Sequence, residues 1–319
     1  MARYLVTGGA GFIGSHLVEE LLRRGERVRV VDDLSTGRRA NLDTAVAAAG
    51  GAAVEFHHGD LADAGVAAAA VAGIDYVLHQ AAIPSVPRSV ADPLTSHRAN
   101  LDATLQLLVA ARDAGVRRVV FAGSSSVYGD AAELPKHEAM TPNPLSPYAL
   151  QKHAGEQYLR LFTRLYGLDT VSTRYFNVFG PRQDPSSPYS GVISLFIRAV
   201  LDGRPPIVHG DGGQTRDFTY VANTVDGVLR AALAPGIAGE VINIATSGRV
   251  SLLALLAEVQ QLLGTALTPV FGPARAGDIR DSQADIGKAE RLLGYRPTVP
   301  FAEGLRRTVE WAAGRALPR

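Results

Sequence analysis

A glycine-rich turn near the start of the chain constrains the fold more than any other feature. The sequence TGGAGFIGSHL follows a short apolar run and opens a helical pattern, so that Gly8, Gly11 and Gly14 are spaced G-x-x-G-x-x-G. Glycines at these places allow a tight turn, close backbone approach to a ligand and close packing of helix on strand. The amides of the helix N-terminus favour an anion. The setting of strand, turn and helix predicts a pyrophosphate-binding motif at the head of a parallel sheet.

Short apolar runs alternate with helical patterns through the first half of the chain. Strands are predicted at residues 4–7, 27–31, 53–57, 76–79, 118–122 and 170–174, with helices such as 15–24 and 100–114 between some of them. This alternation is typical of an α/β fold with a doubly wound parallel sheet, the Rossmann arrangement.

Proline and glycine become frequent from Asn177 onward, whereas residues 240–245 look like a strand that returns to the main sheet. We therefore expect a nucleotide-binding Rossmann domain over residues 1–174, with a returning segment at about 219–246. Residues 175–319 are expected to form mainly a smaller α/β substrate lobe.

The composition excludes several kinds of site. The 319 residues include no cysteine, so disulfides, thiolate catalysis and cysteine-ligated zinc are excluded. A formal net charge of +1 gives no sign of a basic face for nucleic acid. The first residues read as a buried strand rather than a signal peptide, and no apolar run has the length of a membrane span. We expect a cytoplasmic protein that binds no metal, nucleic acid or membrane.

Two carboxylates end the second predicted strand. A carboxylate at this place accepts hydrogen bonds from ribose hydroxyls and repels a 2′-phosphate, which favours NAD over NADP. We interpret Asp32 as the ribose ligand, while Asp33 could instead cap the next turn. Asp60, at the end of the third strand, could accept from the adenine amino group or cap a helix.

The sequence YALQK places Tyr148 four residues before Lys152, so on a helix both side chains share one face. A nearby ammonium stabilises phenolate and lowers the pKa of a phenol, which would let Tyr148 act as a general base near neutral pH. Upstream, a predicted strand ends in Ser124, Ser125 and Ser126, and open α/β sheets bind ligands at the carboxyl ends of their strands. We therefore predict Tyr148, Lys152 and Ser124 as the catalytic residues, with Ser124 relaying a proton to Tyr148.

Several stretches along the chain together resemble one family. They are TGGAGFIGSHL, VVDDLSTG, HGDL, HQAA, SSSVYG, YALQK, RYFNVFGPRQ, GDGGQTRDFTYV and RAGDIRDSQADI. With them the chain is similar to the NAD-dependent epimerase/dehydratase family of extended short-chain dehydrogenases/reductases, in which the cofactor is NAD. The resemblance implies a cofactor site made of Gly8, Gly11, Phe12, Ile13, Gly14, Asp32, Asp33, Ser35, Thr36, Gly37, Asp60, Leu61, Gln80, Ala81, Ala82, Asn100, Tyr148, Lys152 and Tyr175.

The same resemblance implies a nucleotide-sugar site in the second half of the chain. Arg216 and Arg275 are expected on the substrate pyrophosphate, which needs cations. Asp278 is expected on the uridine ribose, Asn177 on a phosphate, and the backbone near Val208 on the uracil. The whole implied substrate site comprises Pro84, Ser85, Ser124, Ser125, Tyr148, Asn177, Gln183, Gly191, Val192, Val208, Arg216, Arg275, Asp278 and Ser282.

The residues after Ser124 bear on the type of reaction. Dehydratases of the family carry an Asp-Glu pair at the next two positions, and decarboxylases carry a Glu just before Val-Tyr-Gly, whereas this chain has Ser125 and Ser126. Without a local acid, elimination lacks its catalyst. We therefore expect reversible C4 epimerisation of a UDP-hexose through a 4-keto intermediate with bound NAD.

Within the family, the chain looks most like UDP-glucose and UDP-N-acetylglucosamine 4-epimerases. The small Ser282 leaves room for a 2-acetamido group where epimerases restricted to plain hexoses carry a tyrosine. Pro84 departs from the glycine expected at its position, and Asn223 replaces an Asp often found there and is expected to cap a helix.

Two other functions stay open at this point. A UDP-glucuronate 4-epimerase would need a further cation for the sugar carboxylate, and Arg182 or Arg88 could supply it. A non-catalytic, NAD-sensing or RNA-binding member of the fold is the other alternative, against which the intact Tyr148, Lys152 and Ser124 argue.

The resemblance also implies a homodimer that pairs two helices of each subunit, here residues 100–114 and 148–166. Leu101, Leu105, Leu108 and Phe162 are candidates either for the seam of that dimer or for the core.

Overall fold

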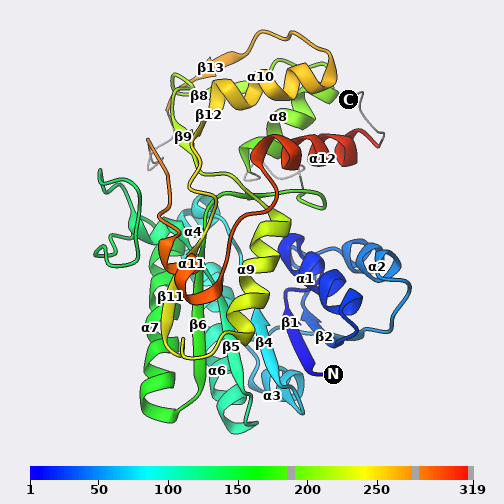
Figure 1. The fold of residues 1–319 in the computed structure, drawn as a ribbon, viewed down its shortest axis with the longest axis vertical. Helices are drawn as coiled ribbons and strands as arrows, with labels where there is room; N and C mark the ends of the chain where they lie inside the picture. Colours follow the sequence, from blue (N-terminus) through cyan, green and yellow to red (C-terminus); the bar gives the residue numbers. More distant parts are fainter. Residues whose placement is uncertain (185–190, 275–279, 315–319) are drawn as a thin grey trace.

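The fold is a parallel sheet with helices on both faces and a smaller lobe at the carboxyl end of its strands (Figure 1). The computed structural model describes residues 1–184, 191–274 and 280–314. The sheet has the strand order β11-β6-β5-β4-β1-β2-β3, and every neighbouring pair is parallel. Its strands are β1 (Arg3–Thr7), β2 (Arg27–Asp32), β3 (Glu55–His58), β4 (Tyr76–His79), β5 (Arg118–Ser124), β6 (Asp169–Tyr175) and β11 (Glu240–Ile244).

Alternation along the central strands explains why the sheet is covered on both faces. Leu5 and Val77 belong to one apolar cluster, while Val6 and Leu78 belong to another, because successive side chains point to opposite faces. The first face carries α3 (Ala64–Val71), α6 (Ala103–Asp113) and α7 (Pro147–Tyr166). The second carries α1 (Phe12–Arg23), α2 (Arg39–Ala48) and α9 (Val221–Leu233).

In its described residues the smaller lobe contains three helices and short strand pairs. The helices are α8 (Val192–Leu201), α10 (Leu252–Leu263) and α12 (Phe301–Ala313). The strand pairs are β8 (Ile207–His209) with β13 (Val270–Gly272), β9 (Thr215–Arg216) with β12 (Val250–Ser251), and β7 (Val178–Phe179) with β10 (Thr219–Tyr220). Between β4 and α6 the chain forms α4 (Val86–Ala91), α5 (Pro93–His97) and a π-helical turn (Arg98–Asp102), and a 3₁₀ turn (Ser125–Tyr128) follows β5.

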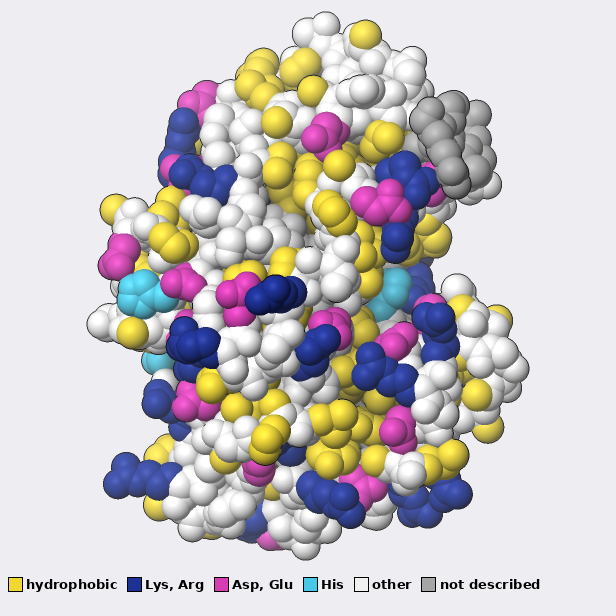
Figure 2. Space-filling model, in the orientation of Figure 1, with side chains coloured by type: hydrophobic (Ala, Val, Ile, Leu, Met, Phe, Trp, Pro, Cys, Tyr) yellow, Lys and Arg dark blue, Asp and Glu magenta, His cyan; other side chains and the backbone are white. Residues whose placement is uncertain are grey.

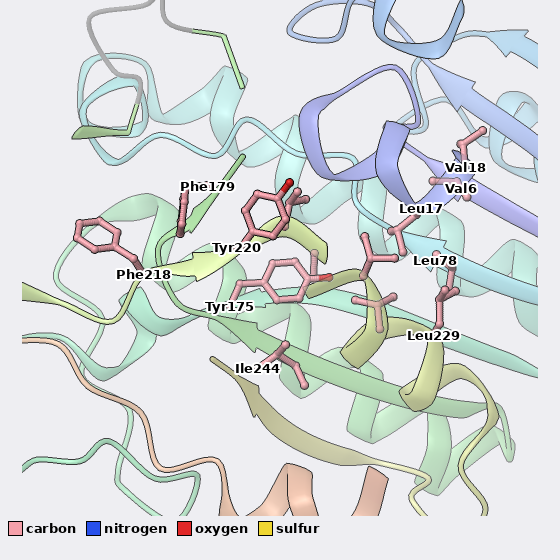
Figure 3. Close-up of a cluster of buried hydrophobic side chains, with 14 of the residues drawn as sticks. Val6, Leu17, Val18, Leu78, Tyr175, Phe179, Phe218, Tyr220, Leu229 and Ile244 are labelled. Carbon is pink, nitrogen blue, oxygen red and sulfur yellow. The ribbon is translucent and has the colours of Figure 1, made fainter. Parts of the chain in front are cut away.

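Sheet and lobe share one hydrophobic core. Figure 3 shows Val6, Leu17 and Leu78 of the sheet side in the same cluster as Phe179 and Tyr220 at the base of the lobe. Burial of this continuous apolar surface holds the two parts together, so that a cavity between them keeps its shape.

The predicted α/β class, the parallel sheet and the returning strand are confirmed, since β11 pairs with β6 as the last strand of the sheet. The predicted division missed a second return. Helix α11 (Gly287–Leu293) packs against β11 and α9, and Ala284 pairs with Lys136 beside the sheet. This part of the expected lobe therefore belongs to the body around the sheet.

The structure corrects one capping prediction. Tyr220 is the N-cap of α9, and Asn223 lies inside its first turn. Its Oδ1 accepts hydrogen bonds from the amides of Thr298 and Val299, and its Nδ2 donates to the Val299 carbonyl. Asn223 thus ties the segment before α12 to α9 instead of capping a helix.

The four residues that could belong either to a dimer seam or to the core differ in their burial. Leu108 and Phe162 are buried in the core beside α6 and α7, whereas Leu101 and Leu105 are half-buried. Within the described residues, no helix is both long and apolar enough to cross a membrane. On the face seen in Figure 2, basic and acidic side chains intermingle, so that face carries no stripe of positive charge.

Candidate active site

A cavity of about 1050 Å³ lies at the carboxyl end of the sheet and extends under the lobe. Most predicted site residues line it. From the cofactor prediction these are Gly8, Gly11, Phe12, Ile13, Gly14, Asp32, Asp33, Ser35, Thr36, Gly37, Asp60, Leu61, Gln80, Ala81, Ala82, Tyr148, Lys152 and Tyr175. From the substrate prediction they are Pro84, Ser85, Ser124, Ser125, Asn177, Gln183, Gly191, Arg216 and Ser282.

The remaining predicted residues lie elsewhere. Asn100 is buried beside the cavity, where its side chain bonds the backbone of Ile83 and the side chain of Gln151. Val208 is buried inside β8, and Val192 begins α8; neither lines the cavity. The expected roles of these three residues toward cofactor and substrate stay predictions. Arg275 and Asp278 lie outside the described residues.

The glycine motif forms a cradle that side chains would fill. Gly8 has φ +63°, and a Cβ there would lie 2.8 Å from the amide nitrogen of Ala81. A Cβ on Gly14 would lie 2.1 Å from the Gly8 carbonyl oxygen. Helix α1 begins directly after Gly11, so its first amides have no partner within the helix. A turn that tolerates only glycine, next to these donors, fits the pyrophosphate of a dinucleotide.

Asp32 and Asp33 have different surroundings. The Asp32 carboxylate is 7% exposed and accepts hydrogen bonds from the amides of Ala10 and Leu34, each 2.9 Å long. Asp33 instead closes a turn by accepting from the amide and hydroxyl of Ser35. Asp32 is thus the better-placed acceptor for a ribose, and burial raises the pKa of its carboxyl group.

Local sequence explains how Tyr148 enters the cavity. Ser146 caps α7 by accepting from the Ala149 amide, and Pro147 occupies the first helical position. Tyr148 is therefore in the first turn, where its amide donates to Ser89 Oγ over 3.1 Å. One turn later, Lys152 is 3% exposed and donates to the Ala122 carbonyl over 2.8 Å.

Ser124 stands at the end of β5 and is oriented by its neighbour. Its Oγ accepts from the amide and the hydroxyl of Ser126, over 3.2 and 2.9 Å. Its own proton therefore points elsewhere, and it forms a hydrogen bond with Tyr148. Ser126 also lines the cavity, but the sequence reasoning gave it no positive role.

The expected lowering of the tyrosine pKa by Lys152 is wrong for the protein without cofactor. Burial raises the pKa of the Tyr148 phenol, and the hydrogen bond from Ser124 opposes that rise. Burial also lowers the pKa of the Lys152 ammonium to about 8, against the attraction of Glu156. The Lys152 nitrogen is 6.0 Å from the centre of the Tyr148 ring, so a further positive charge is needed to favour the phenolate.

The loop after β7 crosses from the lobe to the cofactor side of the cavity. Arg182, with φ +67°, bonds Glu19 on α1 over 2.6 Å and also contacts His16. Asp184 forms an ion pair, 2.5 Å long, with Arg38, which lies on the loop after β2. Sequence reasoning missed Arg38 and Asp184, because the contact spans 146 residues and no local pattern indicates it.

Arg216 and Ser282 face the cavity from adjacent segments of the lobe. The Ser282 amide donates to the Thr215 carbonyl over 3.1 Å, so both follow the course of β9. Asp217 is fully buried and accepts from Thr246 and from the Ala284 amide, which joins this turn to the end of β11. The turn that carries Arg216 is thus fixed against the body around the sheet.

Over the described residues, no group of three or more His, Asp or Glu side chains is arranged to hold a metal ion. The cavity therefore offers a dinucleotide cradle, a Tyr-Ser-Lys group and an arginine, all in one space.

Comparison with known proteins gives the same assignment. The family model described as the NAD dependent epimerase/dehydratase family matches residues 4–245. A UDP-glucose 4-epimerase of Mycolicibacterium smegmatis is 42% identical over 311 residues, covering 97% of this chain and 98% of the relative.

Solved structures agree over nearly the whole length. A UDP-N-acetylglucosamine 4-epimerase from Methanobrevibacter ruminantium, in complex with UDP-N-acetylmuramic acid, has a TM-score of 0.92 at 39% identity and covers 98% of each chain. A Thermus thermophilus UDP-glucose 4-epimerase in complex with NAD has a TM-score of 0.88 at 38% identity, covering 98% of this chain and 99% of that one. This chain belongs to the NAD-dependent epimerase/dehydratase family, and its cofactor is NAD.

Proposed function

We propose that the protein inverts C4 of a UDP-hexose through a 4-keto intermediate, and that UDP-N-acetylglucosamine is accepted as well as, or better than, UDP-glucose. The observation that carries the proposal is the single cavity that joins the glycine cradle, the Tyr148–Ser124–Lys152 group and small residues of the lobe. An intermediate formed there can be reduced again before it leaves.

The residues divide the work of the reaction. When bound by the glycine cradle and Asp32, NAD would supply a hydride acceptor and, once reduced, a hydride donor for C4 of the sugar. Tyr148 takes the proton of the 4-hydroxyl and later gives it back, while Ser124 holds the phenol and the sugar oxygen in line. Arg216 anchors the UDP pyrophosphate while the sugar turns, which keeps the keto sugar in place.

The acids around the cavity favour epimerisation over loss of water. The carboxylates among its described lining residues are Asp32, Asp33, Asp60 and Asp184. All four belong to the cofactor-side strand ends or to the loop after β7, and none stands at the two positions directly after Ser124. Elimination of water across the C5–C6 bond would need an acid and a base near these carbons, and Ser125 and Ser126 provide neither.

The size of the side chains around the predicted sugar site favours an acetylated sugar. Ser282, Gly191 and Ser125 line the cavity with small groups. The relatives described above carry both names, UDP-glucose and UDP-N-acetylglucosamine 4-epimerase, which supports a hexose substrate of either kind.

The uronate alternative now depends on one residue. Arg182 is held by Glu19 and His16, so it is committed to the loop after β7. Arg88 remains as an exposed cation at the cavity lining, at the start of α4. If the protein were a UDP-glucuronate 4-epimerase, the carboxylate of the sugar would lie against Arg88.

Product analysis with UDP-glucose, UDP-N-acetylglucosamine and UDP-glucuronate side by side tests the proposal. We expect the C4 epimers of the first two, with kcat/KM for the acetylated sugar at least equal to that for the plain one. Conversion of UDP-glucuronate alone, or a 4-keto-6-deoxy sugar as product, would contradict it.

A further inference from the structure

A buried histidine lies directly behind the cavity and takes no part in the reaction proposed above. His79 ends β4, is 1% exposed and is followed by the cavity-lining segment Gln80–Ala82. Its ring has a hydrogen-bond partner on each side: Thr7 Oγ1 is 2.7 Å from Nδ1, and Thr104 Oγ1 is 2.9 Å from Nε2.

The contacts of Thr7 determine whether Nδ1 of His79 carries a proton. Thr7 Oγ1 accepts from the amides of Gln80 and Ala81, both over 3.1 Å. A hydroxyl oxygen has two lone pairs, so these donors occupy it and its proton must go to the third neighbour. Thr7 therefore donates to His79 Nδ1, which carries no proton.

The contacts of Thr104 independently determine whether Nε2 of His79 carries a proton. Thr104 Oγ1 donates to the Asn100 carbonyl over 2.7 Å, since a carbonyl can only accept. The hydroxyl is thus an acceptor toward the imidazole, and His79 Nε2 must carry the proton. Both ends require the same neutral tautomer, and burial lowers the pKa of His79 to about 3, which agrees with it.

The chain of hydrogen bonds fixes the floor of the cavity, which we define as Gln80–Ala82. The amide nitrogen of Ala81 lies against Gly8, where a Cβ would approach to 2.8 Å. The side chain of Gln80 accepts from Tyr175 Oη over 3.1 Å. The floor therefore touches the glycine cradle on one side and the Tyr175 end of β6 on the other.

The catalytic lysine is close to the same ring. Phe121 lies 5.7 Å from the His79 ring, and the Lys152 nitrogen is 4.8 Å from the centre of the Phe121 ring. A proton on His79 would add a second positive charge near a buried ammonium, and Lys152 already contributes to keeping it off.

We propose that His79 is a positioning residue for the cofactor. As a neutral Nε2–H imidazole it orients the Thr7 hydroxyl, which in turn holds the backbone of the floor Gln80–Ala82 in the position that NAD binding requires. The half of the ring that faces Thr7 carries this role, and the half that faces Thr104 secures the ring in the core. The inference concerns NAD and does not depend on which sugar is the substrate.

Two substitutions of the histidine separate the halves of its ring. An asparagine oxygen can replace Nδ1 as acceptor for Thr7, whereas a glutamine amide can replace only Nε2 as donor to Thr104. Protein saturated with NAD is mixed with excess NADH, and the rise of NADH fluorescence gives the rate at which NAD dissociates. We expect His79→Asn to stay within about twofold of wild type and His79→Gln to release NAD about tenfold faster, about the effect of one lost buried hydrogen bond.

Thr7→Val provides a second, nearly isosteric test, because it removes the hydroxyl without touching the ring; it should also release NAD about tenfold faster. Tyr295→Phe is the control for stability, since it removes a fully buried hydrogen bond of 2.9 Å to Ala245 far along the chain. It should lower the melting temperature but not the retention of NAD. Equal NAD release from the two His79 variants, normal retention in Thr7→Val, or faster release from Tyr295→Phe would each overturn the proposal. Failure of the wild type to bind NAD would instead refute the proposed function.

Discussion

Tyr148 is the residue on which the proposed chemistry depends, because it lines the cavity, forms a hydrogen bond with Ser124 and lies one turn from Lys152. Since burial raises the pKa of the phenol, the free protein keeps Tyr148 protonated. The positive charge of oxidised NAD would oppose that rise, so the proposed base would become active with the cofactor bound.

Tyr148→Phe should keep the fold and the retention of NAD but reduce kcat by about 10²–10⁴-fold, the usual contribution of a general acid–base group. Steady-state kinetics together with the NADH exchange rate measures both. Near-normal turnover with intact NAD retention would show that another group is the base.

A substitution at Ser282 tests which sugar the protein prefers. Ser282→Tyr would place a ring in the space proposed for the 2-acetamido group, and packed sites tolerate little added volume. We expect kcat/KM for UDP-N-acetylglucosamine to fall at least about 10-fold more than for UDP-glucose, equivalent to about 1.4 kcal/mol. A joint loss of both activities would mean that Ser282 only supports the loop backbone.

Secondary-structure elements are where the sequence was most informative. The glycine motif, the strand-end Asp32 and Ser124, and the helix of Tyr148 all follow from local patterns, and parallel strands bring their carboxyl ends to one edge. The sequence therefore predicted both the sheet and most of the cavity lining.

The remaining features depend on contacts between distant residues. Helix α11 has only seven residues, too few for a clear period, so its return to the sheet could not be seen. Asn100, expected by resemblance near the nicotinamide end of the cofactor, lies in a π-helical turn where its side chain bonds the backbone of Ile83. Arg38 pairs with Asp184, and His79 joins two threonines, only after the chain has folded.

His79, at the end of β4, should make the stability of the protein depend on pH. The pKa of His79 is lowered to about 3 in the folded protein from its ordinary 6.5, so between these values only the unfolded chain binds the proton. The stabilising contribution is complete above about pH 6.5 and is lost as pH falls toward 3, by about 1.4 kcal/mol per pH unit for one group. Urea denaturation between pH 7 and 4.5 should show a shallower loss of unfolding free energy in His79→Asn than in wild type. Identical slopes would mean that His79 is protonated in the folded protein.

At the scale of the whole molecule, we propose that two copies pair through α6 and α7. Leu150, Leu161 and Leu165 are 46–63% exposed and recur at intervals of 11 and 4 along α7, which puts them on one face. An exposed apolar stripe of this kind is typical of an interface.

The double substitution Leu161→Glu and Leu165→Glu should convert a dimer, with twice the 33.7 kDa mass of the chain, into a monomer in sedimentation or light scattering. Leu233→Glu, at the end of α9 where the leucine is 56% exposed, is the matched control and should remain dimeric. A monomeric wild type, or dissociation by the control substitution, would contradict this interface.

We propose that the hydrogen removed from C4 of the sugar is returned to the other face of the same sugar within one cavity. UDP-glucose deuterated at C4 tests this return of the hydrogen, with the product examined by mass spectrometry and nuclear magnetic resonance. We expect UDP-galactose that retains the deuterium at C4, because the cavity would hold sugar and cofactor together until the second transfer. Loss of the deuterium to solvent during epimerisation would contradict it.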